Sequence, residues 1–111
     1  MEYPLNVAFR HIPRSAQIVT FVNKKAYRLN CFSDRITNCQ VVIDSHHDPG
    51  KNGNLFRVRI VLSLPDCKII VGNDPGQRHL YKSLSYAIID TFDSAFNLVW
   101  TYLQNPQSDK R

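Results

Sequence analysis

Residues 55–64, with the sequence L-F-R-V-R-I-V-L-S-L, decide the fold of this chain. Large apolar residues occupy every second position of the segment, namely Phe56, Val58, Ile60, Leu62 and Leu64. Arg57 and Arg59 lie between them. Because successive side chains of a strand point to opposite faces, a period of two is typical of a half-buried β-strand. The segment therefore predicts a strand with an apolar face toward a core and a basic face opposite.

Shorter segments on both sides of this strand show the same alternation. Further strands are predicted at residues 5–9, 37–45 and 67–71, each with one apolar face. Residues 46–54 contain Pro49, Gly50 and Gly53 and predict a polar hairpin loop, and residues 73–77 predict a second loop.

Two segments have helical spacing instead. Ser15 is a suitable N-cap for a helix over residues 16–32, in which apolar residues recur every three or four positions. Residues 80–103 contain no Gly or Pro and predict a long second helix. The order is β-α-β-β-β-α. We therefore predict an α+β fold, a four-stranded sheet with two helices packed on one face, as a single domain over residues 1–111.

Size and composition agree with one globular domain. The 111 residues are 43% hydrophobic and 21% charged, which is typical of a folded protein with its own core. The net charge of +5 and a pI near 9.3 favour an anionic partner. An odd number of cysteines, with neither a signal peptide nor a membrane-spanning segment, predicts a cytoplasmic protein without a disulfide framework.

The sequence offers no catalytic constellation, so we expect no enzyme activity and no cofactor. The scattered carboxylates are interpreted as caps and solvated charges, and Cys39 and Cys67 as small core residues. The histidine pair His46-His47, with His11 or His79, suggests a metal site, but the spacing matches no zinc motif. We therefore predict no metal, and interpret the pair as exposed loop residues or as phosphate contacts.

Basic residues gather in two places. Lys24, Lys25 and Arg28 share one face of the first helix, and Arg57 and Arg59 share one side of the third strand. Several cations on one surface are what phosphate binding requires. The helical group is equally typical of the solvated side of an amphipathic helix.

A run of motifs then extends through the chain. It comprises F-S-D-R-I-T-N-C-Q-V-V-I at 32–43, G-N-L-F-R-V-R-I-V-L-S-L-P at 53–65, I-I-V at 69–71, D-P-G at 74–76 and A-I-I-D-T-F-D-S-A at 87–95. From about Leu5 to Leu103 the chain resembles the ribosome hibernation-promoting factor and ribosome-associated inhibitor family, also called sigma-54 modulation proteins.

The resemblance implies a fold similar to double-stranded RNA-binding domains. It also implies a stress-response function: binding of ribosomal RNA on the small subunit, in the channel used by mRNA and tRNA, so that translation stops. The candidate RNA-binding residues are Lys25, Arg28, Arg35, His47 and Arg59, which match family positions, with Lys24, Lys51 and Arg57 added on charge. Since the sequence stops at Arg111, we expect the short form of the family, without its C-terminal dimerisation domain.

The chain departs from the family pattern in its second helix. Phe96 and Asn97 stand where relatives carry a basic pair, and Ser83 and Ser85 stand where an acidic-aromatic pattern is usual. The apolar residues Phe96, Val99 and Trp100 are interpreted as core, with a homodimer surface or a protein-binding site as alternatives. The alternative function is therefore a protein-interaction module.

Overall fold

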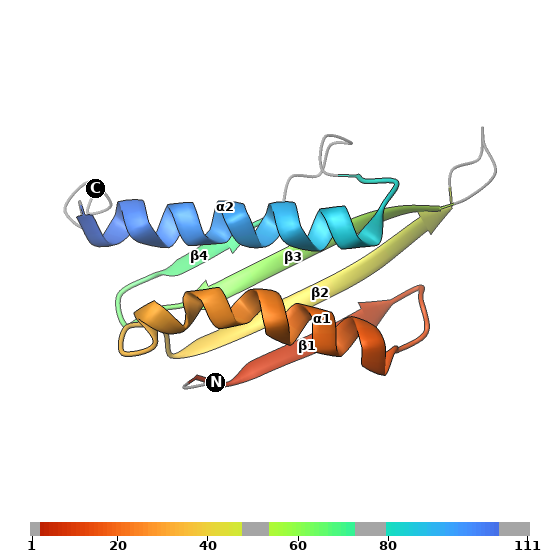
Figure 1. Cartoon of the computed structure of the whole chain (residues 1–111). Helices are drawn as coiled ribbons and strands as arrows, with labels where there is room; N and C mark the ends of the chain where they lie inside the picture. Colours follow the sequence, from red (N-terminus) through yellow and green to blue (C-terminus); the bar gives the residue numbers. More distant parts are fainter. Residues whose placement is uncertain (1–2, 48–53, 73–79, 105–111) are drawn as a thin grey trace.

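The four strands form one sheet with both helices on the same face (Figure 1). The structure is a computed structural model that describes residues 3–47, 54–72 and 80–104. Its elements are β1 (Leu5–Arg10), α1 (Ala16–Ala26), the 3-10 helix η1 (Tyr27–Phe32), β2 (Asn38–His47), β3 (Asn54–Ser63), β4 (Lys68–Val71) and α2 (Leu84–Gln104). The predicted α+β fold is confirmed.

The strands lie in the sheet in sequence order, β1-β2-β3-β4. β1 runs parallel to β2, and the other neighbours are antiparallel. A parallel pair needs a long crossover connection, which α1 and η1 supply here. The pairing of β2 with β3 extends from Asn38↔Ser63 to His47↔Asn54. The predicted loop over 46–54 was therefore wrong at both ends, because His46 and His47 belong to β2 and Asn54 belongs to β3. Residues 48–53 lie outside the described part of the chain.

The core lies between the sheet and the helices. Val58, Ile60 and Leu62 of β3 are 0–1% exposed, and they pack in one cluster with buried residues of both α-helices. Cys39 is also fully buried, as predicted, whereas Cys67 is only partly buried against the same cluster. The alternation along β3 thus leaves Arg57 and Arg59 on the other side of the sheet, which we call the open face.

The first predicted helix is divided in two. α1 ends at Ala26, and the chain continues as a 3-10 helix from Tyr27 to Phe32. Ala26, Leu29 and Phe32 are all buried and lie three residues apart. A 3-10 helix has three residues per turn, so residues three apart lie in one line toward the core, whereas at 3.6 residues per turn the same three positions would spread over about 120°. The periodicity was thus interpreted correctly as helical but assigned to the wrong kind of helix over its last turns.

α2 begins at Leu84, four residues later than predicted. Tyr81 instead extends the sheet locally, because its backbone N–H and C=O both pair with Phe56, at 2.8 and 2.7 Å. Ser83 precedes the helix, and its Oγ accepts a hydrogen bond from the Tyr86 N–H at 3.2 Å. Burial, followed by the hydrogen bond that its hydroxyl donates to Asp90, raises the pKa of Tyr81 to about 12.

Among the described residues, no helix has the length and apolar character to cross a membrane.

Gly72 directly follows β4 and adopts a backbone conformation that requires glycine. Its φ is +80°, and a Cβ at this position would lie 2.2 Å from the carbonyl oxygen of Val58. We expect Gly72→Ala to lower the free energy of unfolding by about 2 kcal/mol or more, through backbone strain and the steric clash. Urea denaturation followed by circular dichroism measures the change. The control is Lys68→Ala at the exposed start of β4, and an equal midpoint for Gly72→Ala and wild type would contradict the prediction.

Candidate nucleic-acid interface

The predicted basic residues lie on two opposite sides of the molecule. Lys24 and Lys25 belong to α1, on the helical side; Lys24 is exposed, and the Lys25 Nζ lies 5.4 Å from the centre of the Phe21 ring. Arg57 and Arg59 belong to the open face of the sheet. The structure therefore does not bring these candidates together into one flat surface.

The open face carries a row of charged side chains across three strands. Arg10 of β1 is the register partner of Asp44 in β2, which is the partner of Arg57 in β3. Arg59 lies one pair further along the same face, opposite Val42. Sequence reasoning missed Arg10. Its position was available from the alternation of β1, in which Leu5, Val7 and Phe9 face the core.

Asp44 has a defined site, contrary to its interpretation as a solvated charge. Its carboxylate oxygens lie 2.9 Å from His11 Nδ1 and 3.2 Å from His46 Nε2. His11 has a φ of 60°, in the left-handed region that residues other than glycine seldom adopt. Burial alone raises the pKa of Asp44, but the hydrogen bond with His11 and the charges of both histidines outweigh it and lower the pKa.

Among the described residues, the histidines do not belong to a cluster that could hold a metal ion. His46 and His47 are the last residues of β2 rather than loop residues. Within the described ranges, no group of three or more His, Cys, Asp or Glu residues is arranged to hold a metal ion. His79 lies outside those ranges.

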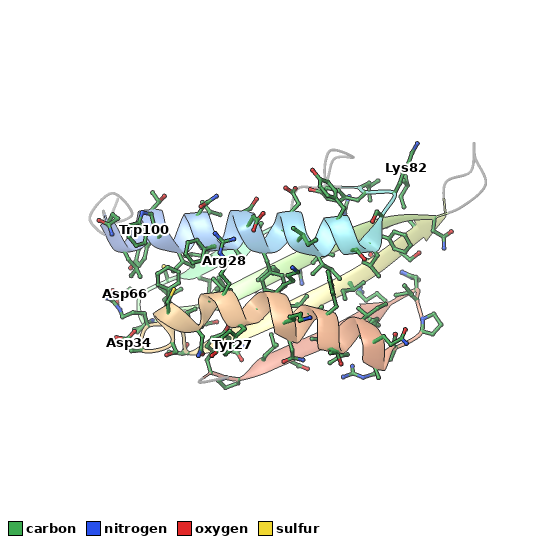
Figure 2. All side chains as sticks on the ribbon, in the orientation of Figure 1. Tyr27, Arg28, Asp34, Asp66, Lys82 and Trp100 are labelled. Carbon is green, nitrogen blue, oxygen red and sulfur yellow. The ribbon has the colours of Figure 1, made fainter. Side chains whose placement is uncertain are left out.

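Arg28 joins η1 to α2 instead of projecting with the lysines of α1 (Figure 2). Its Nη1 donates a hydrogen bond to Asp93 at 2.7 Å, and its guanidinium lies 4.2 Å from the centre of the Phe96 ring. Phe96 in turn contacts Phe32, with ring centres 5.2 Å apart. Phe96 thus holds Arg28 by a cation–π contact, and Asp93 offsets the charge of Arg28.

Two other candidates, Arg35 and His47, lie near opposite ends of β2. Arg35 is exposed in the turn before β2, and its N–H donates to the carbonyl of Phe32 at 2.8 Å. His47 is the last residue of β2, and Lys51 lies outside the described residues.

The apolar group at the end of α2 divides between core and surface. Val99 is fully buried, which confirms its interpretation as core and excludes it from the alternative partner surface. Phe96 is partly buried under Arg28. Trp100, in contrast, is 52% exposed, and Leu98 is 45% exposed.

The fold occurs in solved structures of other proteins. A ribosomal subunit interface protein from Coxiella burnetii aligns with a TM-score of 0.73 over 92% of this chain and 99% of that chain, at 12% identity. The chain has the fold of a ribosomal subunit interface protein. The N-terminal domain of Thermus thermophilus Protein Y aligns with a TM-score of 0.66 over 87% of this chain and 94% of that chain, at 23% identity.

Their fold is the one that the family resemblance in the sequence implies, so the expectation is confirmed at the level of the fold. No protein-family model matches the sequence, and no curated protein sequence is significantly similar to it.

The contacts of Asp44 predict a dependence of stability on pH. Because its pKa is lowered in the folded state, the ionised carboxylate stabilises the fold above the ordinary aspartate pKa of about 3.9, and this contribution is lost as the pH falls through the lowered value. We expect Asp44→Asn to cost about 1 kcal/mol of unfolding free energy near pH 6 and progressively less toward pH 2. Urea denaturation at a series of pH values measures this, with Asp34→Asn, at an exposed turn, as control. A difference that does not change with pH would contradict the prediction.

Adjacent residues of α2 should differ sharply in their effect on stability. Val99→Ala removes fully buried atoms and should cost about 2 kcal/mol, whereas Trp100→Ala should change stability by less than about 0.5 kcal/mol. Thermal and urea unfolding of the two variants provide the comparison. A large cost for Trp100→Ala would show that the indole is part of the core.

Proposed function

We propose that the protein binds the ribosome through ribosomal RNA and inhibits translation. The observation that carries the proposal is the shared fold, which extends over 92% of this chain and 99% of a ribosomal subunit interface protein. The excess of Lys and Arg, with a net charge of +5, supports it, because cations supply the affinity for RNA phosphates. Such a role places the protein in the cytoplasm. It requires no catalytic group, because a protein that occupies the path of mRNA and tRNA on the ribosome inhibits translation by its presence alone.

The small subunit, in the channel for mRNA and tRNA, is the site that we propose. Lys24 and Lys25 lie on the helical side, and Arg57 and Arg59 lie on the open face of the sheet. A flat RNA surface contacts only one side of a protein, whereas the walls of a channel contact two sides at once. The shortest extent of the molecule is 17 Å, as expected for a sheet with one layer of helices, and favours insertion between such walls.

The two sides are expected to contribute unequally. Arg28 is engaged by Asp93 and Phe96, so its charge is partly offset on the helical side. On the open face, Arg10 and Arg57 lie on either side of Asp44, and Arg59 lies one pair along the same face, so three described cations share one described carboxylate. We therefore assign the larger share of the phosphate contacts to the open face, with Arg35, His47 and Lys51 as further candidates.

Co-sedimentation with purified small ribosomal subunits across a salt series tests the function. We expect comigration that weakens as the salt concentration rises, because bound phosphates release counterions. Arg57→Glu/Arg59→Glu should weaken binding more than Lys24→Glu/Lys25→Glu. Each lost phosphate contact should also lower the salt slope by about one.

Lys82→Glu is the control for charge reversal, since Lys82 is exposed just before α2 (Figure 2). Circular dichroism of each variant confirms that it is folded. Absence of comigration by the wild type at low salt would refute ribosome binding, and wild-type binding by both folded double variants would refute the proposed residues.

The exposure of Trp100 favours a second candidate function, binding of a protein partner through the end of α2. Exposed tryptophan is enriched at centres of protein interfaces. Trp100→Ala separates the candidates: it should leave ribosome binding intact if the RNA contacts proposed above hold the complex.

A further inference from the structure

The open face of the sheet contains a hollow of about 100 Å³. Strands β1, β2 and β3 contribute to it together with Gly72, and its described lining comprises Arg10, Val42, Asp44, Arg57, Arg59 and Gly72. Gly72 directly follows β4 and has no side chain to fill the space beside Arg59. The hollow is therefore a feature of the sheet itself, whose position is fixed by strand register.

Three guanidinium groups converge on this hollow from two strands. Arg10 and Arg57 are the register partners of Asp44 from opposite sides, and Arg59 lies one pair along the same face. Arg57 and Arg59 are partly buried, so their stems are held by the surrounding side chains. Cations on a rigid frame bind an anion with less loss of conformational entropy than cations on a loop.

The described residues that line the hollow carry more positive than negative charge. Among them are three arginines and one carboxylate, that of Asp44, whose oxygens both also lie within 3.2 Å of a histidine nitrogen. Like charges held close together raise the local potential, which an anion relieves. The planar fork of arginine matches the oxygens of phosphate and binds two of them at once.

We propose that this hollow is a binding site for a phosphate group, with Arg10, Arg57 and Arg59 as its donors. A phosphate fits better than a carboxylate, because it presents more oxygens and more charge to three guanidinium groups. The group comes either from an RNA backbone or from a free phosphate compound such as a nucleotide. In the first case the inference rests on the function proposed above; in the second it is independent of that function.

The test uses the full chain and inorganic pyrophosphate as the probe, in isothermal titration at constant ionic strength with sodium chloride as the reference salt. Saturable binding of pyrophosphate is expected, with shifts of the arginine Nε–H signals of Arg10, Arg57 and Arg59 in NMR spectra. Arg57→Gln/Arg59→Gln should weaken binding by about tenfold or more, since each removes a charged hydrogen bond. Lys82→Gln removes an exposed charge outside the hollow and should have no effect.

Two further variants keep the test decisive if the double variant does not fold. Arg10→Gln, at an exposed position of an edge strand, should also weaken binding, and Asp44→Asn should strengthen it by removing the one carboxylate among the described residues of the lining. No saturable binding beyond that of chloride, or an equal loss in Lys82→Gln, would overturn the proposal.

A short single-stranded RNA distinguishes the sources of the phosphate. Displacement of this RNA by pyrophosphate identifies the RNA backbone as a ligand of the hollow, and pyrophosphate binding without RNA binding identifies a free phosphate compound. Ribosome co-sedimentation is measured separately with the same variants. Pyrophosphate binding without ribosome binding would refute only the proposed function, and ribosome binding without pyrophosphate binding would refute only the phosphate site.

Discussion

The alternation of side chains along β3 couples the hydrophobic core to the basic surface. Val58, Ile60 and Leu62 are buried against the helices, so Arg57 and Arg59 must lie on the open face. A shift of one residue in the pairing of β3 would bury both arginines and expose the apolar residues. The energy that stabilises the core therefore also fixes the position of the cations, and β2 and β4 on either side hold this register.

Most of the fold followed from local patterns in the sequence. Period-two alternation identified all four strands, and helical spacing identified both helices. The errors lie where tertiary contacts outweigh local preference. Leu29 and Phe32 select a 3-10 turn because both must reach the core, and Tyr81 extends the sheet because Phe56 offers backbone partners. Neither requirement is visible in the spacing of residues along the chain.

The candidate site was less predictable than the fold. Basic residues could be counted from the sequence, but their distribution over two sides depends on how α1 packs on the sheet. Arg28 shows the limit most clearly: its partners Asp93 and Phe96 are more than sixty residues away in the chain. The side of the sheet on which Arg10 lies follows from the alternation of β1, but the hollow that Arg10 lines emerges only when three strands are placed in register.

Gly72 has a further consequence for the edge of the sheet. An exposed edge strand offers unpaired backbone groups that can recruit a strand from another chain, and proteins limit this hazard by keeping edge strands short or charged. β4 spans only four residues and begins with Lys68, and the positive φ of Gly72 turns the chain away from the extended conformation directly after Val71. Gly72, which has no side chain on the open face, therefore also limits the number of unpaired backbone groups that the β4 edge offers to a strand of another chain.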